Sequence, residues 1–225
     1  MSKLYVIGTP IGNLEDITLR ALRILKEVDL ILCEDTRVTR KLLSHYEINT
    51  STLSYHSNSK LSKVDKIIDF LKNGKDLALV SDAGTPAISD PGSKLISTIR
   101  EDLPETQIIT IPGVSALTSF VSIAGIKSNE FTFLGFLPHK KGRETQFKEI
   151  GESDKTFIFY ESPHRIIKTL ESLNKFAPDK QIVVGKELTK IHEEIIKGSS
   201  EYVLDYFIKN QDKIRGEFVV SVSRV

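Results

Sequence analysis

Short apolar runs alternate with amphipathic segments along the whole chain, and this alternation constrains the fold more than any other feature. It predicts β-α-β units, in which helices connect the parallel strands of a sheet. The predicted strands are Leu4–Ile7, Leu30–Cys33, Thr52–Tyr55, Leu77–Ser81, Ile108–Ile111, Phe131–Phe136, Thr156–Tyr160, Ile182–Val184, Glu194–Lys197 and Phe218–Val222. The predicted helices are Ile17–Lys26, Arg37–Tyr46, Leu61–Lys72, Pro91–Glu101, Val114–Ala124, Arg143–Ile150, Pro163–Phe176 and Glu201–Lys209.

The number of predicted strands indicates two sheets, because so many strands exceed the usual size of one sheet. We therefore expect an α/β fold with two α/β domains, residues 1–125 with a mostly parallel sheet and residues 126–225 with a mixed sheet. The boundary is predicted near Gly125–Asn129. After Glu187 the strands follow one another with little helix between them, which predicts antiparallel pairing in the second sheet.

Composition is that of a soluble globular protein, with 40% hydrophobic and 27% charged residues in a chain of 225. The net charge of +1 gives no global positive field, although a local basic patch stays possible. The single Cys33 excludes an internal disulfide and a cysteine-rich metal cluster, and His192 and Glu193 lack metal-ligand spacing. No run resembles a signal peptide or a membrane span. We expect a cytoplasmic protein with no membrane association and no metal.

Proline-containing turns follow several predicted strands. These turns contain Pro10, Pro86, Pro112, Pro138 and Pro163. In an open α/β sheet, ligands bind in the crevice outside the carboxyl ends of the strands. The chemistry is therefore expected on the rim that these turns form, with both domains contributing.

The stretch Leu77–Gly92 contains the richest of these turns. Its apolar strand stops at Ser81, and two carboxylates, Asp82 and Asp90, then follow among glycines and prolines. Such residues fix the shape of a loop beside a ligand, although a well-capped connection between strand and helix explains them equally well. Asp90 is predicted to cap a helix that begins at Pro91.

The loop after the first strand, Gly8–Thr18, has two glycines that permit close approach of a ligand to the backbone. It matches neither a dinucleotide-binding glycine motif nor a P-loop. Asp16 is predicted to cap the helix that starts at Ile17. A plain connecting loop is the alternative interpretation. Ile111–Phe120 raises the same two alternatives, because its small residues suit either backbone contact with a ligand or close packing.

Charged residues follow the second strand in the segment Cys33–Arg37. Glu34, Asp35 and Arg37 stand at a functional position, although Asp35 could serve only as a helix cap and Arg37 could simply be solvated. Together with Arg40 and Lys41, Arg37 forms a predicted basic face. A charged helix face is usually just solvated.

Two further segments place charge in the second half of the chain. His139–Lys148 is basic and suits phosphate binding, with a solvated loop as the alternative. Glu161–Arg165 predicts Ser162 as a helix cap, and it brings Glu161, His164 and Arg165 to the rim. A histidine in a first helical turn is more often a surface residue than a base.

The sequences and the order of these motifs, together with the segments FLGFLP, KELTK and GEFVV, resemble the ribosomal RNA small subunit methyltransferase I family within the tetrapyrrole methylase superfamily. The resemblance covers essentially the whole chain. The combination of CEDTR, SDAGTPAISDPG and ESPHR is specific to this family and not to its corrin- or porphyrin-methylating relatives. The matching segments are GTPIGNLEDIT, CEDTR, LVSDAGTPAISDPG, IPGVSAL, FLGFLP, YESPHR, KELTK and GEFVV.

This resemblance implies two α/β domains with S-adenosyl-L-methionine in a cleft between them, and a homodimer. It also implies 2′-O-methylation of a cytidine in 16S rRNA of the small ribosomal subunit. Thr85 stands where superfamily relatives have Asp. The cofactor-binding residues implied by the resemblance are Pro10, Ile11, Asp82, Gly84, Thr85, Ile88, Ser115, Ala116, Tyr160 and Glu161, with the Lys186–Glu187 region nearby.

Typical members of the family continue into a short helical extension after the GEFVV segment, whereas this sequence ends at Val225. RNA contact is then expected to depend on basic residues within the two domains, or on a pre-assembled ribosomal particle. The predicted RNA-binding residues are Arg37, Arg40, Lys41, Lys140, Lys141, Arg143 and Arg165.

Methyl transfer from a sulfonium needs a nucleophile held in line with the methyl group, and a ribose hydroxyl needs a proton acceptor. The predicted catalytic residues are Glu34, Asp82 and Lys186, with Glu34 or Asp82 favoured near the hydroxyl; Asp90 and Glu161 are further candidates. Two other functions stay open at this point. One is methylation of a tetrapyrrole, which the charged segments disfavour, and the other is a non-catalytic RNA-binding module in ribosome assembly.

Overall fold

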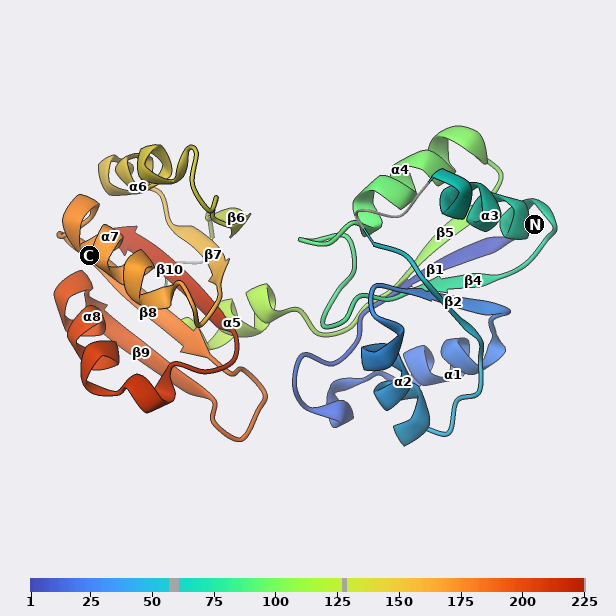
Figure 1. Cartoon of the computed structure of the whole chain (residues 1–225), viewed down its shortest axis with the longest axis horizontal. Helices are drawn as coiled ribbons and strands as arrows, with labels where there is room; N and C mark the ends of the chain where they lie inside the picture. The colour runs from blue at the N-terminus through green and yellow to red at the C-terminus, as the bar shows by residue number, and fades with distance from the viewer. Residues whose placement is uncertain (57–60, 127–128, 225) are drawn as a thin grey trace. The chain divides into compact units, whose positions relative to one another are not determined.

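The computed structural model describes residues 1–56, 61–126 and 129–224 (Figure 1). The chain divides into two compact units, Met1–Ser115 and Ala116–Val225, each with a five-stranded sheet. This division falls before helix α5 (Ala116–Ala124), whereas the sequence placed the boundary after it, in a segment partly outside the described residues. The helix belongs to the second unit because it packs against two strands of that sheet.

The sheet of the first unit is entirely parallel, as predicted. Its strands lie in the order β3-β2-β4-β1-β5, so the carboxyl ends of all five meet at one edge. The strands are β1 (Lys3–Ile7), β2 (Leu30–Cys33), β3 (Thr52–Ser54), β4 (Leu77–Leu79) and β5 (Gln107–Ile111).

Helices cover both faces of this sheet (Figure 1). The helices are α1 (Leu19–Glu27), α2 (Thr36–His45), α3 (Leu61–Lys72) and α4 (Gly92–Asp102), with a short 3-10 turn, η1 (Leu14–Asp16), before α1. Successive residues of β2 serve opposite cores: Ile31 and Cys33 pack under α1 and α2, and Leu32 packs under α3 and α4. Burial on both faces explains why these strands are continuous apolar runs.

The sheet of the second unit is mixed, with the order β6-β7-β10-β8-β9. β6 and β7 are parallel, and the other neighbours are antiparallel, which confirms the predicted antiparallel pairing near the carboxyl terminus. The strands are β6 (Thr132–Phe136), β7 (Phe157–Glu161), β8 (Lys180–Lys186), β9 (Glu194–Ser199) and β10 (Phe218–Arg224).

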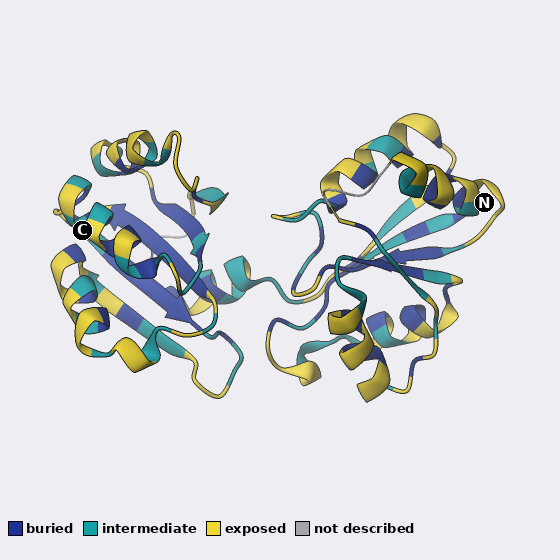
Figure 2. Cartoon of the chain, in the orientation of Figure 1, coloured by how far each residue is buried: buried dark blue, intermediate teal, exposed yellow. Residues whose placement is uncertain are grey.

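One face of this second sheet carries the main core of the unit. Phe157, Phe159 and Val220 pack there against α6 (Arg143–Glu152), α7 (Ile166–Phe176) and α8 (Ser200–Lys209), which leads into a 3-10 turn, η2 (Gln211–Lys213). The opposite face receives α5, whose Phe120 lies where a side chain on Gly185 would stand. In both units the buried residues follow the central strands, and exposed residues lie on helices and loops (Figure 2).

Each predicted strand and helix is present, and the differences are confined to element ends. Asp16 does not cap α1; that helix begins at Leu19, and the Thr18 hydroxyl accepts a hydrogen bond from the Ala21 N–H at 3.1 Å. Ser162 does not cap α7 either, because the chain makes an extra turn before Ile166. Among the described residues, no helix is both long and apolar enough to cross a membrane.

Candidate functional site

Three loops at the carboxyl edge of the first sheet are joined by hydrogen bonds. Thr9, after β1, and Gly84, after β4, exchange backbone hydrogen bonds of 3.0 Å each in an antiparallel bridge. The Thr9 hydroxyl is 3.3 Å from the Ser81 carbonyl, and the Thr85 hydroxyl donates to the Val114 carbonyl at 2.9 Å. Because Val114 follows β5, the loops after β1, β4 and β5 form one connected rim.

Two glycines let the first and third of these loops touch. A Cβ atom built on Gly8 would lie 2.8 Å from the Cα of Gly113, a distance that real side chains do not tolerate. Gly84 contributes a backbone with φ of 82°, which favours glycine. The two loops therefore meet through their backbones at Gly8 and Gly113.

Asp90 fixes the shape of the loop that follows β4. Its Oδ2 accepts a hydrogen bond from the Ala87 N–H at 2.7 Å, and its Oδ1 accepts one from the Gly92 N–H at 2.8 Å. Ala87 has a φ of 68°, a conformation that a non-glycine residue adopts only when its surroundings hold it there. Asp90 thus holds the loop just before α4. The prediction that it caps a helix beginning at Pro91 was wrong, because α4 begins at Gly92 with Pro91 as its N-cap. The neighbouring Ile88 stays 49% exposed.

A second carboxylate connects the loops after β2 and β4. The Asp82 Oδ1 accepts a hydrogen bond from the Asp35 N–H at 2.9 Å, although the two residues are 47 positions apart. Asp35 caps α2 as predicted and also pairs with the Arg37 guanidinium at 2.6 Å. Hydrogen bonds from the side chain and then the backbone of Arg37 lower the pKa of Asp35 to about 2.

The pKa of Glu34 is raised by burial and by its place beside Asp90 and Asp82. Its carboxyl is half-buried, and burial raises its pKa, followed by the negative charges of Asp90 and Asp82; a backbone hydrogen bond from Asp82 opposes them. Within the described ranges, none of these three carboxylates forms an ion pair. A carboxyl in such surroundings is suited to accept a proton, and the group as a whole favours a cation.

Glu161, at the end of β7 in the second unit, lies in the opposite kind of environment. Its side chain is fully buried and accepts hydrogen bonds from the Arg165 Nε at 2.7 Å, the Thr169 hydroxyl at 2.7 Å and the Ser162 N–H at 2.8 Å. The Arg143 guanidinium lies 3.6 Å from its other oxygen. The partners of Glu161 favour an internal role over cofactor contact. Arg143 and Arg165 are largely buried, and both form ion pairs with Glu161 inside the unit. Their binding of RNA stays a prediction.

Lys186, at the end of β8, is also buried and paired. Its ammonium lies 3.6 Å from Glu194, which accepts further hydrogen bonds from Lys213 and Tyr206. Burial acts to raise the pKa of Glu194, but the hydrogen bonds from Tyr206 and Lys213 outweigh it, and the net shift is downward. Because the ammonium is buried and already paired with a carboxylate of the protein, the predicted catalytic role of Lys186 gains no support from its surroundings.

The other predicted binding residues fall into two exposed basic segments and a set of loop positions. Arg37, Arg40 and Lys41 are exposed on α2. Lys140 and Lys141 are exposed in the loop before α6. The remaining positions line loops or strand ends: Pro10 and Ile11 after β1, Ser115 and Ala116 at the start of α5, and Tyr160, whose ring contacts Phe133 and Phe136 edge-on.

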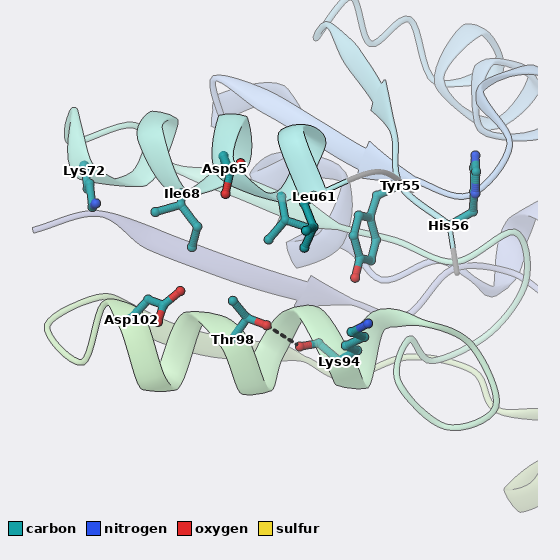
Figure 3. Close-up of a pocket in the computed structure, with 10 residues that line it drawn as sticks. Tyr55, His56, Leu61, Asp65, Ile68, Lys72, Lys94, Thr98 and Asp102 are labelled. Carbon is teal, nitrogen blue, oxygen red and sulfur yellow. Dashed lines mark hydrogen bonds between the residues drawn. The ribbon is translucent and has the colours of Figure 1, made fainter. Parts of the chain in front are cut away.

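Two cavities were not predicted from the sequence. One, of about 500 Å³, lies between α3 and α4, with the Tyr55 ring directed between the helices and the Thr98 hydroxyl donating to the Lys94 carbonyl (Figure 3). The other, of about 480 Å³, adjoins the cluster of Lys186 and Glu194. No residue of the rim after β1, β2, β4 and β5 lines either one. Sequence spacing gave no signal for them, because their walls come from distant segments.

Two contacts were also not predicted from the sequence: the hydrogen bond from Asp35 to Asp82, and the contact of Gly8 with Gly113. Both join residues that are far apart along the chain. The signal that was available was topological: parallel strands bring their following loops to one edge. That signal predicts that such loops meet, but not which atoms of them touch.

Comparison with known proteins gives the same fold and a family. The family model described as Tetrapyrrole (Corrin/Porphyrin) Methylases matches residues 3–203. The solved uroporphyrin-III C-methyltransferase from Thermus thermophilus, complexed with S-adenyl homocysteine, superposes with a TM-score of 0.67 over 98% of this chain and 97% of its own, at 15% identity. At that identity the likeness concerns the fold alone.

Relatives of much higher identity carry one shared name. The protein named ribosomal RNA small subunit methyltransferase I from Hydrogenobaculum sp. (strain Y04AAS1) is 46% identical over 99% of this chain and 96% of its own length. Its namesake from Bacillus subtilis (strain 168) is 44% identical over 99% of this chain but only 75% of its own length, so relatives differ in how much sequence lies outside the match. The chain belongs to the tetrapyrrole methylase family, on the branch of these ribosomal RNA small subunit methyltransferase I relatives.

Proposed function

We propose that this protein transfers a methyl group from S-adenosyl-L-methionine to the 2′-hydroxyl of a cytidine in 16S rRNA of the small ribosomal subunit. The observation that carries the proposal is the near full-length match, at 46% identity, to a relative named for methylation of small-subunit ribosomal RNA. The resemblance of the motifs supplies the cytidine and the ribose position. Such a substrate places the reaction in the cytoplasm.

The rim of the first unit fits this cofactor. The contact of Gly8 with Gly113, and the positive φ of Gly84, give the loops after β1, β4 and β5 a fixed shape. The carboxylates at positions 34 and 82 complement the positive sulfonium and ammonium groups, and the exposed Ile88 offers an apolar surface. The residues proposed to hold the cofactor here are Pro10, Ile11, Asp82, Gly84, Thr85, Ile88, Ser115 and Ala116.

Thr85 has a limited choice of hydrogen bonds. Its hydroxyl proton is directed to the Val114 carbonyl at 2.9 Å, so toward a ligand the oxygen acts as an acceptor. This preserves part of what a carboxylate would do at the same position. The amino group of the cofactor is a donor and is the natural partner for such an oxygen.

The cofactor supplies an electrophilic methyl group, and the protein must align the ribose hydroxyl and receive its proton. Glu34 is the proposed proton acceptor, since its half-buried carboxyl has a raised pKa and no ion pair among the described residues. Asp82 is exposed, and its carboxylate accepts a hydrogen bond from the Asp35 N–H, which joins the loop after β4 to the loop after β2. Asp82 therefore positions the site and contributes negative charge near the sulfonium.

The RNA is proposed to contact the exposed basic segments of the two units. These are Arg37, Arg40 and Lys41 on α2, and Lys140 and Lys141 before α6. Contacts to phosphates and 2′-hydroxyl groups suit an RNA substrate whose target base is unstacked. A homodimer is part of the same proposal, on the strength of the family resemblance.

A direct assay tests this function. Purified protein is incubated with radiolabelled S-adenosyl-L-methionine and with assembled small subunits, free 16S rRNA or porphyrin precursors. Ribose methylation is then mapped on small-subunit RNA from cells with and without the gene. We expect label in small-subunit RNA at a single cytidine ribose that loses its methyl group when the gene is absent. Label in a porphyrin precursor alone, or none in any substrate, would refute the proposal.

A further inference from the structure

The buried carboxylate of Glu161 organises a set of contacts that the proposed chemistry does not use. Its Oε1 accepts from the Arg165 Nε and the Ser162 N–H, and its Oε2 accepts from the Thr169 hydroxyl. The Thr169 oxygen in turn accepts from the Arg143 Nη2 at 2.7 Å. With a fully buried side chain, Glu161 has no surface left for RNA or cofactor.

Each of the two arginines has a further contact, and both contacts lead to the same place. The Arg165 Nη1 donates to the Leu137 carbonyl at 3.1 Å, and the Arg143 Nη1 donates to the Pro138 carbonyl at 3.1 Å. Leu137 and Pro138 are the first residues after β6. The carboxylate therefore fixes two guanidinium groups, and these hold two successive carbonyls of one loop.

The loop held in this way carries the basic residues of the second unit. His139, Lys140 and Lys141 are exposed, and a turn with the Arg143 N–H donating to the Lys140 carbonyl at 3.2 Å leads into α6. Across the part of the chain that the structure describes, neither lysine side chain has an ion pair or a hydrogen bond to the protein. Their charge is available to phosphate groups.

We infer that Glu161 is a positioning residue for RNA binding: through Arg143 and Arg165 it fixes the loop from which Lys140 and Lys141 contact the phosphates of the substrate RNA. A loop held in its binding geometry loses less conformational entropy on association than a loose one. The inference rests on the proposed function, because it takes RNA as the substrate. It assigns an indirect role to Glu161, which was predicted to bind the cofactor, and to Arg143 and Arg165, which were predicted to bind RNA.

The experiment compares steady-state methylation of assembled small subunits by the wild type and by Glu161→Gln, which keeps the shape of the side chain and removes its charge. We expect KM for the subunit to rise about tenfold with kcat within about twofold, because binding is impaired and the reacting groups are untouched. Affinity for S-adenosyl-L-methionine, measured by calorimetry, stays at the wild-type value. Glu144→Gln is the charge-matched control, since Glu144 is exposed on α6 and pairs only with Lys148 among the described residues.

Salt dependence separates positioning from a general loss of structure. The double substitution Lys140→Ala/Lys141→Ala removes two phosphate contacts, so the slope of log binding against log salt should fall by about 1.4 for single-stranded RNA. Glu161→Gln should reduce the slope in the same direction. When Glu161→Gln is added to the Lys140→Ala/Lys141→Ala variant, KM should rise no further, because the two lysines through which Glu161 acts are already absent.

Several results would overturn the inference while leaving the proposed function intact. One is an unchanged KM in Glu161→Gln. Another is an effect of Glu161→Gln on KM that adds fully to that of Lys140→Ala/Lys141→Ala. The third is a loss of cofactor affinity in Glu161→Gln. If Glu161→Gln does not fold, Thr169→Val replaces it, since that change removes the hydroxyl between Glu161 and Arg143 and should raise KM by a smaller factor. Absence of any wild-type methylation of small subunits refutes the proposed function itself.

Discussion

Glu34 and Glu161 occupy comparable places, each at or just beyond the carboxyl end of a strand, yet their surroundings are opposite. Glu34 is half-buried beside Asp82 and Asp90, with no cation paired to it among the described residues. Glu161 is fully buried with two guanidinium groups and a threonine hydroxyl around it. One carboxyl has a raised pKa, and the other has its charge compensated on every side.

This difference separates chemistry from architecture. A carboxylate without a cationic partner is poorly stabilised as an anion, so it accepts a proton readily and attracts a positively charged ligand. A carboxylate with several donors is held in one geometry and transmits that geometry to whatever its donors also contact. The first arrangement suits the methyl transfer proposed for the first unit, and the second suits the support of a binding loop.

The largest effect should follow from breaking the compensated site. Glu161→Ala leaves two largely buried guanidinium groups without their anion, which is expected to lower the free energy of unfolding by about 3–5 kcal/mol. Urea denaturation followed by circular dichroism measures it. Glu144→Ala, at an exposed carboxylate, should change the same quantity by less than about 0.5 kcal/mol. Equal effects of the two substitutions would remove the distinction between the carboxylates.

Next in size is the effect on the rate of methylation at the uncompensated site. Glu34→Gln should reduce single-turnover methyl transfer about 100-fold or more, because the proton acceptor is lost, and this factor should exceed any loss of cofactor affinity that follows from removing the negative charge. Rapid-quench measurement with saturating enzyme reports this step. Glu15→Gln, at an exposed carboxylate in the loop after β1, is the control and should stay near the wild-type rate. If Glu34→Gln and Asp82→Asn both kept the full rate, the catalytic proposal would fail.

A steric test addresses the contact between the loops after β1 and β5. Gly8→Ala places a methyl group 2.8 Å from the Gly113 backbone, so the loops must separate, and a loss of about 1–3 kcal/mol of stability is expected. Gly113→Ala should act similarly from the other side. Because both changes open the same contact, the double variant should lose less than the sum of the two. Strict additivity would show that the two glycines are independent.

The smallest effect is a pH dependence of stability with a defined sign. The folded-state pKa of Glu34 is raised, so the folded protein is penalised once pH rises above that pKa, and the penalty disappears below the unfolded value of about 4.3. Glu34→Gln should therefore raise Tm at pH 7, and the gain should disappear at pH 4.

Asp35 provides the opposite sign for comparison. Its pKa of about 2 lies below the unfolded value, so its favourable contribution is present at neutral pH and is lost as pH falls toward 2. Asp35→Asn should thus lower Tm at pH 7, with the difference shrinking in acid. If Glu34→Gln and Asp35→Asn shifted Tm in the same direction at pH 7, the assignment of Glu34 as an uncompensated carboxyl would be wrong.

Much of the fold was accessible from local patterns. The bounds of β2 were predicted to the residue, because it is a continuous apolar run with a clear start and stop. Helix starts were less predictable: Asp16, Thr18 and Ser162 are all suitable caps, and only the path of the preceding chain decides which of them is used. The capping role of Asp35 agrees with the sequence because its hydrogen bond reaches only the next turn of the chain, whereas α4 begins at Gly92 with Pro91, not Asp90, as its N-cap.

The sequence by itself determined the α/β alternation, the parallel first sheet, the mixed second sheet and the edge of the first sheet where the loops after its strands meet, because these follow from short-range periodicity and strand direction. Only the tertiary structure decided which carboxylates are compensated. Charge and burial act through space, and the partners of Glu161 and the neighbours of Glu34 come from segments that spacing does not connect. Residue types identified the candidates, and their surroundings distinguish the carboxyl proposed to accept a proton from the one proposed to position a loop.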